Sequence, residues 1–189
     1  MKFNLLARIL FAGFIIFEFL NLSGVLNIPL DFSWLGLLVT AVAVWLIIEL
    51  IGYLLRDPHI LTIGLWIGLA GLGLDAGGDI FRLYSKFGWY DQVIHLIVGA
   101  GLAYLLLIIS KKIFQNCPNQ LIISLFTIGM TTLLGFLYEL EEYAEDFFIH
   151  HRSLRLGDGW DTVNDMFLNL VGALLITFLF NLVKKLQHD

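Results

Sequence analysis

The sequence predicts an all-α, polytopic membrane protein in which residues 1–189 form a single transmembrane helical domain, a bundle of about six transmembrane helices. Two observations lead to this prediction. The chain is 59% hydrophobic and only 14% charged, which is more apolar than a soluble domain of this size could bury. Apolar stretches of about 20 residues also recur along its whole length, and a helix needs that many residues to cross a hydrocarbon core.

Helices, rather than strands of a membrane barrel, follow from the pattern within these stretches. Residues 35–53 show none of the alternation of polar and apolar residues that a barrel strand has. The limits of the apolar stretches place the helices at residues 5–27, 34–55, 60–83, 91–110, 120–143 and 161–183. The first stretch is similar to a signal peptide, but Glu18 interrupts it and no small-residue cleavage site follows. We therefore expect a retained first helix.

The distribution of lysine and arginine predicts the orientation in the cytoplasmic membrane, because basic residues favour the cytoplasmic side. Six spans place both termini on one side. That side carries seven basic residues (Lys2, Arg8, Arg56, Lys111, Lys112, Lys184 and Lys185), and the other carries four (Arg82, Lys86, Arg152 and Arg155). We therefore expect cytoplasmic termini. The net charge of -5 argues against a nucleic-acid partner, the lone Cys117 cannot form a disulfide within the chain, and the sequence predicts no oligomeric state.

Acidic and histidine side chains recur at helical spacing near the ends of four predicted spans, and this threading places all of them at the outer face. They are Asp75 and Asp79 in the third span, Asp91 and His95 in the fourth, Glu139, Glu142 and Asp146 in the fifth, and Asp161 and Asp165 in the sixth. Residues three or four apart share one face of a helix. An ionisable group within a span costs about 2.5–3.5 kcal/mol, so such groups usually mark a site or a water-filled cavity.

Several carboxylates that lie close together repel one another unless a cation neutralises them. We therefore expect a divalent metal ion, held by Asp91, His95, Glu139, Glu142, Asp161 and Asp165. Oxygen donors with one imidazole suit Mg²⁺, Mn²⁺ or Ca²⁺ and leave Zn²⁺ or iron open. His95, Glu142 and Asp161 are the expected catalytic residues. For Asp91 and Asp161, an alternative interpretation is that they only cap the starts of their helices.

The remaining polar residues have simpler interpretations. Glu18 and Asn21, three residues apart in the outer half of the first span, could join the acidic residues at the outer face, but we expect them instead to hydrogen-bond a neighbouring helix. Glu49 is expected to reach the membrane interface or to pair with Arg56. The loop after the fifth span is interpreted as exposed surface, although arginines beside a metal site would also suit an anionic phosphate; its basic residues are His150, His151, Arg152 and Arg155.

Three strings carry a family resemblance: Tyr90-Asp91-Gln92-Val93-Ile94-His95 with Gly99, Leu137-Tyr138-Glu139-Leu140-Glu141-Glu142, and Gly159-Trp160-Asp161-Thr162-Val163-Asn164-Asp165-Met166 with Gly172-Ala173. The chain resembles the YjdF-like bacterial membrane proteins and, more distantly, the VanZ-like family. The first resemblance implies a multi-spanning envelope protein without an assigned activity, and the second implies a link to glycopeptide resistance. The row Asp75, Asp79, Arg82, Gly88, Asp91 and His95 is also similar to that of the CDP-alcohol phosphotransferases, but Ile80 stands where that family has glycine.

Three functions remain open at this stage. The first is a metal-dependent enzyme that acts on a lipid headgroup or a lipid-linked phosphate at the outer leaflet, with membrane lipids as its partners. The second is a cation or proton transporter or channel that uses the same acids. The third is a non-catalytic envelope-resistance protein. Because the cytoplasmic halves of the spans contain few polar groups apart from Glu49, the enzyme is favoured over the transporter.

Overall fold

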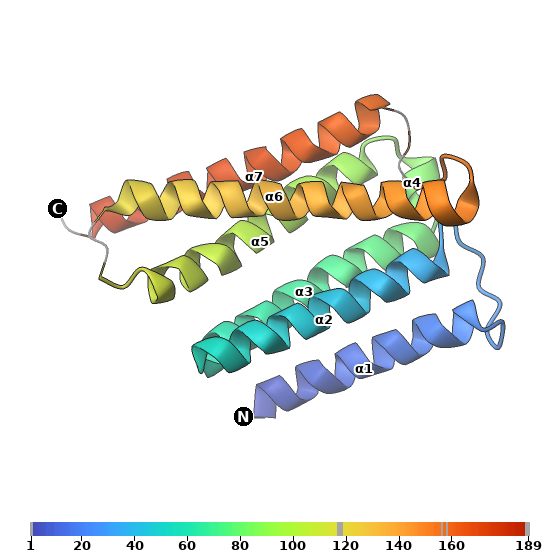
Figure 1. The fold of residues 1–189 in the computed structure, drawn as a ribbon, viewed down its shortest axis with the longest axis horizontal. Coiled ribbons are helices and arrows are strands. Elements are labelled where there is room, and N and C mark those ends of the chain that lie inside the picture. The colour runs from blue at the N-terminus through green and yellow to red at the C-terminus, as the bar shows by residue number, and fades with distance from the viewer. Residues whose placement is uncertain (1, 117–118, 156, 158, 188–189) are drawn as a thin grey trace. The chain divides into compact units, whose positions relative to one another are not determined.

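The computed structural model describes residues 2–116, 119–155, 157 and 159–187, and within these residues the protein is all-α. The prediction of six helices long and apolar enough to cross a membrane is confirmed. Figure 1 shows their order: α1 (Lys2–Leu22), α2 (Trp34–Leu55), α3 (Pro58–Ile80), the short α4 (Leu83–Lys86), α5 (Tyr90–Ile113), α6 (Gln120–Glu145) with the π-helical turn η1 (Asp146–His150), and α7 (Gly159–Leu186). Cys117 and Asp158 lie outside the described residues.

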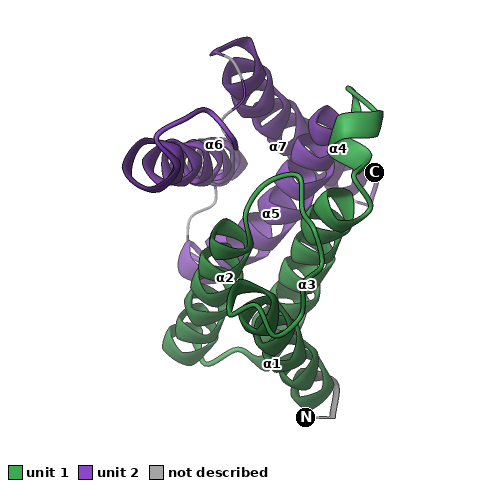
Figure 2. Cartoon of the chain, turned by 90° about the vertical axis from the view of Figure 1, so that its right-hand side faces the viewer, with its two compact units in different colours: residues 1–90 green, residues 91–189 purple. Residues whose placement is uncertain are grey.

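The chain divides into two compact units, residues 1–90 and 91–189, which are coloured separately in Figure 2. Unit 1 contains α1 to α4, and unit 2 contains α6, α7 and α5 from Asp91 onward. The single domain expected for residues 1–189 remains a prediction.

The first helix ends at Leu22, five residues earlier than the sequence suggested. Gly24 has a positive φ of 76°, its N–H donates to Asn21 O at 3.0 Å, and the N–H of Val25 donates to Leu20 O at 3.0 Å. This pair of bonds is a Schellman motif, which satisfies the last carbonyls of a helix and needs a left-handed residue, usually glycine, just beyond the end. The apolar run of residues 25–30 therefore belongs to a connection rather than to α1.

Side-chain caps explain where three of the helices begin. Ser33 accepts from the N–H of Leu35 before α2, and Asp57 accepts from the N–H of His59 before α3. Asn119 accepts from the N–H of Leu121 before α6. Each cap satisfies an N–H that has no partner inside its helix.

Unit 1 is a bundle in which α1, α2 and α3 pack against one another. Its core consists of Ala7, Phe11, Ala41, Ile48, Leu65 and Leu72. Glu49 on α2 forms a two-pronged ion pair with Arg8 on α1, at 2.5 and 2.6 Å, and not the expected pair with Arg56. A bidentate pair of this kind satisfies both charges within the bundle.

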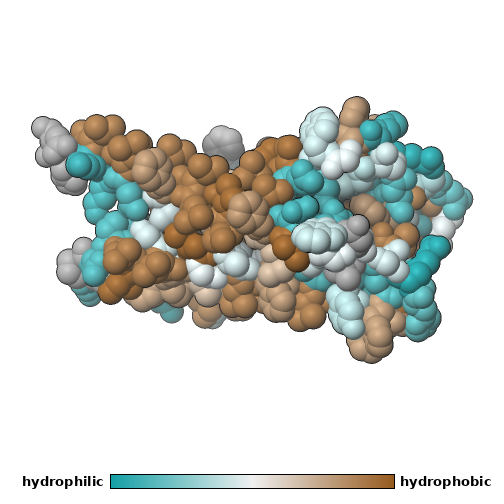
Figure 3. Space-filling model, turned by 90° about the horizontal axis from the view of Figure 1, so that it is seen from above, coloured by the Kyte–Doolittle hydropathy of each residue, from teal (hydrophilic) through white to brown (hydrophobic). Residues whose placement is uncertain are grey.

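The surface of the helices is largely apolar. Figure 3 shows hydrophobic side chains over the long helical stretches and hydrophilic ones gathered toward the helix ends. Large apolar residues with exposed fractions of 60% or more include Leu5, Leu46, Leu125 and Phe178 on four different spans. Lipid is the solvent that such a surface requires, and the protein is integral to a membrane.

Candidate metal centre

The three long helices of unit 2 approach closely at one level, and glycines make the approach possible. A Cβ atom at Gly172 on α7 would lie 2.7 Å from Ala100 N and Leu96 O of α5. A Cβ at Gly99 on α5 would lie 2.8 Å from Asn169 Cα, and one at Gly135 on α6 would lie 2.7 Å from Asn169 Nδ2. Small residues allow membrane helices to pack backbone to backbone. The Asn169 amide therefore sits where α5, α6 and α7 meet.

One turn from this layer, four ionisable side chains converge. His95 Nε2 lies 3.5 Å from Asp91 Oδ1, 3.9 Å from Glu139 Oε1 and 3.9 Å from Asp165 Oδ1. Asp91 and His95 come from α5, Glu139 from α6 and Asp165 from α7. We call these four residues the acid–histidine cluster. The four-residue spacing from Asp91 to His95 places both on one face of α5, as the sequence predicted.

Burial distinguishes the inner members of this cluster from the outer one. The side chains of Glu139 and Asp165 are 4% and 6% exposed, whereas that of Asp91 is 29% exposed. The cluster therefore opens on the side of Asp91. Glu139 Oε1 and Asp165 Oδ1 are buried atoms without a hydrogen-bond partner among the described residues. A buried carboxylate oxygen without a partner is costly, and its presence indicates a missing ligand or proton.

The donor atoms fit a single metal ion. One ligand atom from each of Asp91, His95 and Asp165 lies within 4.8 Å of the other two. Ligands at ~2.1 Å from a shared tetrahedral ion stand ~3.4 Å apart, which is close to the 3.5–3.9 Å measured from His95 Nε2. Three carboxylates with one imidazole also suit octahedral Mn²⁺ or Mg²⁺. The residues present thus fit a divalent metal ion.

Asn169 controls the imidazole from its other side. Asn169 Nδ2 lies 3.2 Å from His95 Nδ1. With the amide turned this way, Nδ1 accepts and Nε2 keeps its hydrogen in the neutral ring. With the amide reversed, the Asn169 oxygen accepts from Nδ1–H, and the Nε2 lone pair faces the carboxylates. The second orientation is the one that metal binding requires, and it is the usual support of a histidine ligand.

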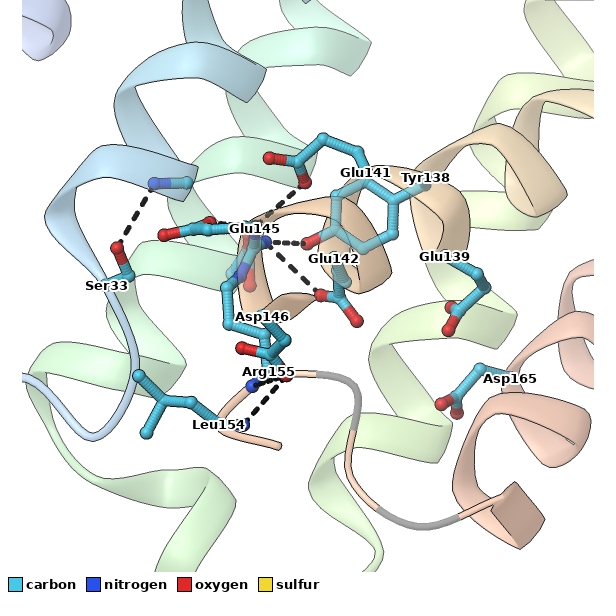
Figure 4. Close-up of polar contacts among 12 residues, drawn as sticks. Ser33, Tyr138, Glu139, Glu141, Glu142, Glu145, Asp146, Leu154, Arg155 and Asp165 are labelled. Carbon is cyan, nitrogen blue, oxygen red and sulfur yellow. Dashed lines mark hydrogen bonds and ion pairs between the residues drawn. The ribbon is translucent and has the colours of Figure 1, made fainter. Parts of the chain in front are cut away.

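Two residues predicted to share the centre are placed differently. Glu142 is not among the described residues whose donor atoms converge, and its Oε1 lies 3.2 Å from Arg155 Nη2 (Figure 4). Asp161 lies one turn before Asp165 and acts electrostatically on it and on Glu139, but it is not one of the three residues whose donor atoms converge. The metal-binding and catalytic roles of Glu142 and Asp161 remain predictions.

The capping interpretation of Asp91 and Asp161 does not match the helix starts. α5 begins at Tyr90 and α7 at Gly159. Both aspartates therefore lie inside the first turn of their helices. There they can favour the positive end of the helix dipole, but an N-cap residue precedes the first helical residue.

Arg155 is the main residue that sequence reasoning misplaced. It was interpreted as exposed loop surface, yet it is 8% exposed. Its guanidinium lies 2.8 Å from Glu141 and Glu145 and 3.2 Å from Glu142. It also donates to the Tyr138 hydroxyl at 3.2 Å. Figure 4 shows these carboxylates gathered around the guanidinium, while Glu139 and Asp165 lie apart from it. An excess of acids near one loop was the only signal in the sequence.

The electrostatics of Arg155 follow from this setting. Burial lowers the pKa of the guanidinium, but Tyr138 and the surrounding glutamates outweigh burial, so the pKa lies above its ordinary value. The Asp146 carboxylate binds the same loop through the backbone N–H groups of Leu154, at 2.8 Å, and Arg155, at 2.9 Å. Arg155 is therefore already occupied by protein carboxylates, which makes it unsuited to binding a substrate phosphate.

The chain belongs to a family described as a predicted membrane protein (DUF2238), whose model matches residues 4–186. This match agrees with the YjdF-like resemblance, while the more distant VanZ-like resemblance remains a prediction. Neither the curated proteins nor the solved structures gave a match. The family description names the membrane but no activity, so the function has to be argued from the site.

Proposed function

We propose that the protein is a divalent-metal-dependent membrane enzyme that acts on a lipid headgroup or a lipid-linked phosphate. One observation carries the proposal: Glu139 Oε1 and Asp165 Oδ1 are buried without a hydrogen-bond partner among the described residues, and each lies 3.9 Å from the same imidazole nitrogen, His95 Nε2. In a membrane interior such oxygens need a counter-charge. The lysine and arginine distribution supports cytoplasmic termini and an outward-facing site.

The residues of the cluster have different parts in this proposal. Glu139, Asp165 and His95 would hold the ion from the buried side, and Asp91 would complete the set at the open side. When bound, such an ion would polarise a phosphoryl or ester oxygen and acidify water. Asp161, one turn nearer the start of α7, would accept the proton from the attacking water. Glu142 is less suited to that role, because Arg155 holds its carboxylate.

The apolar surroundings of the cluster favour a membrane lipid as the substrate. The surfaces of the helices around the cluster are apolar, with exposed Val93 on α5, Leu140 on α6 and Val163 on α7. A lipid in the surrounding bilayer can therefore bring its headgroup to the open side of the cluster without leaving the membrane.

The test begins with metal binding by the purified protein. Calorimetric titration with Mn²⁺, Mg²⁺ and Zn²⁺ should show one site, which Asp165→Asn and Glu139→Gln weaken strongly. Glu142→Gln is the matched control and should bind metal as the parent does, because its carboxylate belongs to Arg155. If Asp165→Asn binds every ion as tightly as the parent, the proposal is wrong.

Activity is tested next, with phosphatidic acid and a polyprenyl diphosphate in mixed micelles. Release of inorganic phosphate should require the ion that binds in the titration and should be lost in Asp165→Asn. Asp161→Asn should lower turnover while leaving metal affinity nearly unchanged. A parent protein that binds metal but releases no product from either lipid would leave the transport candidate below.

Cation transport is the second candidate, and a specific observation favours it. The expectation that the cytoplasmic halves of the spans contain few polar groups is not met in unit 2. Hydroxyl and amide side chains lie on two helices beyond the cluster, at intervals of three, four or eight residues: buried Thr131, Thr127 and Ser124 on α6, and buried Asn169 and Thr177 with the partly buried Asn181 on α7. Asn181 donates to Ser124 at 3.1 Å, across the two helices.

This polar stripe ends at an open, mostly apolar groove of about 410 Å³ on the surface of α6 and α7, whose lining includes Gln120, Ser124, Thr177 and Asn181. Proteoliposomes that enclose a fluorescent Mn²⁺ indicator would test transport. Thr127→Val keeps the shape of a fully buried residue and removes its hydroxyl, so it should slow Mn²⁺ entry without changing Mn²⁺ affinity. Thr132→Val is the control, since this residue is only partly buried. Equal rates for both variants would refute transport along the stripe.

A further inference from the structure

Unit 1 contains a buried acid that the metal centre does not use. Glu18 on α1 is 0% exposed, and neither of its carboxylate oxygens has a hydrogen-bond partner among the described residues. The sequence suggested a hydrogen bond to a neighbouring helix. Its companion Asn21 instead bonds within its own segment, to Phe17 O at 2.9 Å and to the N–H of Ile28 at 3.2 Å. Glu18 is thus left inside a membrane-spanning bundle with its charge uncompensated.

The charged groups near Glu18 add further negative charge. On α3, Asp75 acts electrostatically on Glu18, and Asp79 follows Asp75 by one turn. Asp79 is 1% exposed and has one oxygen, Oδ2, without a partner. On α2, Glu49 is already paired with Arg8. Among the described residues, the charged groups that act on Glu18 and Asp79 are acids: Asp75 acts on both, and Asp31, which pairs with Arg82, acts on Asp79.

Other carboxylate oxygens of the aspartates on α3 do have hydrogen-bond donors. Asp79 Oδ1 accepts from the backbone N–H of Asp31 at 2.6 Å and of Phe32 at 3.0 Å. Asp75 accepts from the Tyr84 hydroxyl at 2.7 Å. These carboxylate oxygens therefore have a structural role, in hydrogen bonds within unit 1. Glu18 on α1 is different, because both of its oxygens lack a hydrogen-bond donor. If this residue only filled space in the bundle, a leucine would do so at lower free energy.

We propose that Glu18 is the centre of a second cation-binding site, in unit 1, which takes a small monovalent cation, either a proton or Na⁺, between Glu18 on α1 and Asp75 on α3. A buried carboxylate in a membrane needs a cation to neutralise it. A divalent ion fits less well, because the described residues whose donor atoms converge tightly enough for a metal are Asp91, His95 and Asp165 in unit 2. A proton needs only one carboxylate, and Na⁺ can share carboxylate and backbone oxygens.

The first test uses dicyclohexylcarbodiimide, an apolar reagent that adds the O–H of a protonated carboxyl across its N=C bond. The purified full chain is treated in detergent, and the adduct is located by peptide mass spectrometry. We expect Glu18 to be modified, modification to fall as pH rises, and the adduct to disappear in Glu18→Gln. A Na⁺ site additionally predicts that Na⁺ prevents the modification while choline does not. A proton site predicts equal modification in both salts.

Thermal stability gives a second measurement that does not depend on access of the reagent. The folded bundle holds the cation and an unfolded chain releases it, so the melting temperature should fall as pH rises in choline chloride. If the cation is Na⁺, adding Na⁺ should restore it. Glu18→Gln, a neutral residue of the same shape, should melt at a temperature that neither pH nor Na⁺ changes through this site.

Glu49→Gln is the matched control, because Glu49 is a span carboxylate that already has an arginine partner. It should keep the pH dependence of the parent. The inference is refuted if Glu18→Gln and the parent show the same pH and Na⁺ dependence and Glu18 is not modified at low pH. Metal binding in unit 2 is measured on the same Glu18→Gln protein and should be unchanged. The two proposals are therefore tested independently of each other.

Discussion

Replacing Arg155 with methionine tests whether the loop after α6 is held by buried charge. Methionine has similar length and no charge, so Glu141, Glu142 and Glu145 lose the guanidinium that lies 2.8–3.2 Å from them. Arg155 and Glu145 are both 4% exposed at the side chain, so water replaces little of the lost interaction. We expect Arg155→Met to destabilise unit 2 and to release the loop from α6.

The magnitude follows from the kind of ion pair. Removing one partner of a buried pair costs about 3–5 kcal/mol, because the remaining charge is left without compensation. Glu145 keeps His150 as a second partner at 2.8 Å and the Glu141 side chain is 28% exposed, which places the expected loss at the lower end of that range. Arg155→Lys should cost about half as much. In arginine, Nη1 donates to Glu141 and Glu145, and Nη2 donates to Glu142 and Tyr138. The single ammonium nitrogen of lysine cannot replace both of these nitrogens.

The assay is reversible unfolding in detergent, followed by circular dichroism. Arg152→Met is the matched control, since Arg152 lies in the same loop and is exposed. A surface charge of that kind contributes about 0–1 kcal/mol. Equal stability losses for Arg155→Met and Arg152→Met would show that Arg155 does not hold the loop in the way the structure indicates.

Three further substitutions test other parts of the structure. Gly172→Ala should destabilise the protein by about 1–3 kcal/mol, because the new Cβ would meet backbone atoms of α5. Gly129→Ala is the control: a Cβ there meets nothing within 4 Å, so this variant should be neutral or more stable by about 0.5–1 kcal/mol. Thermal unfolding compares the two variants. Asn169→Leu should weaken metal binding about 10–100-fold by releasing the His95 ring, and Asn169→Asp should largely retain it, as measured by calorimetry. Gly24→Ala should cost about 1–2 kcal/mol, because alanine is strained at a φ of 76°, and a loss below 0.3 kcal/mol, on the order of the error of such comparisons, would contradict this.

Hydropathy predicted the helices well because a span must present apolar surface over its whole length. The range 34–55 was predicted with the same bounds that α2 has. The first helix was extended too far because the residues after Gly24 are also apolar, so hydropathy does not separate a span from an apolar connection. The Schellman glycine carried that information, and local turn chemistry would have found it.

The acid–histidine cluster was predictable in part because helix spacing sets direction. Asp91 and His95 share a face, and the spacing from Asp165 to Asn169 is the same. Glu142 was assigned to the same stripe as Glu139, but a step of three residues turns a side chain by about 60° around the helix. That turn is enough to direct Glu142 to Arg155. Which of two near neighbours faces a partner depends on tertiary packing, which spacing alone does not specify.

The two candidate functions of unit 2 can be ranked by what their polar groups already bind. The hydroxyls of the stripe donate to carbonyls of their own helices: Thr131 to Thr127 O at 2.8 Å, and Thr177 to Ala173 O at 2.7 Å. Such bonds satisfy the hydroxyl hydrogens without any ion. The unpartnered oxygens of Glu139 and Asp165 have no equivalent substitute among the described residues. The cluster therefore lacks a ligand or a proton, whereas the stripe lacks neither, and this difference is why we propose metal-dependent chemistry ahead of transport.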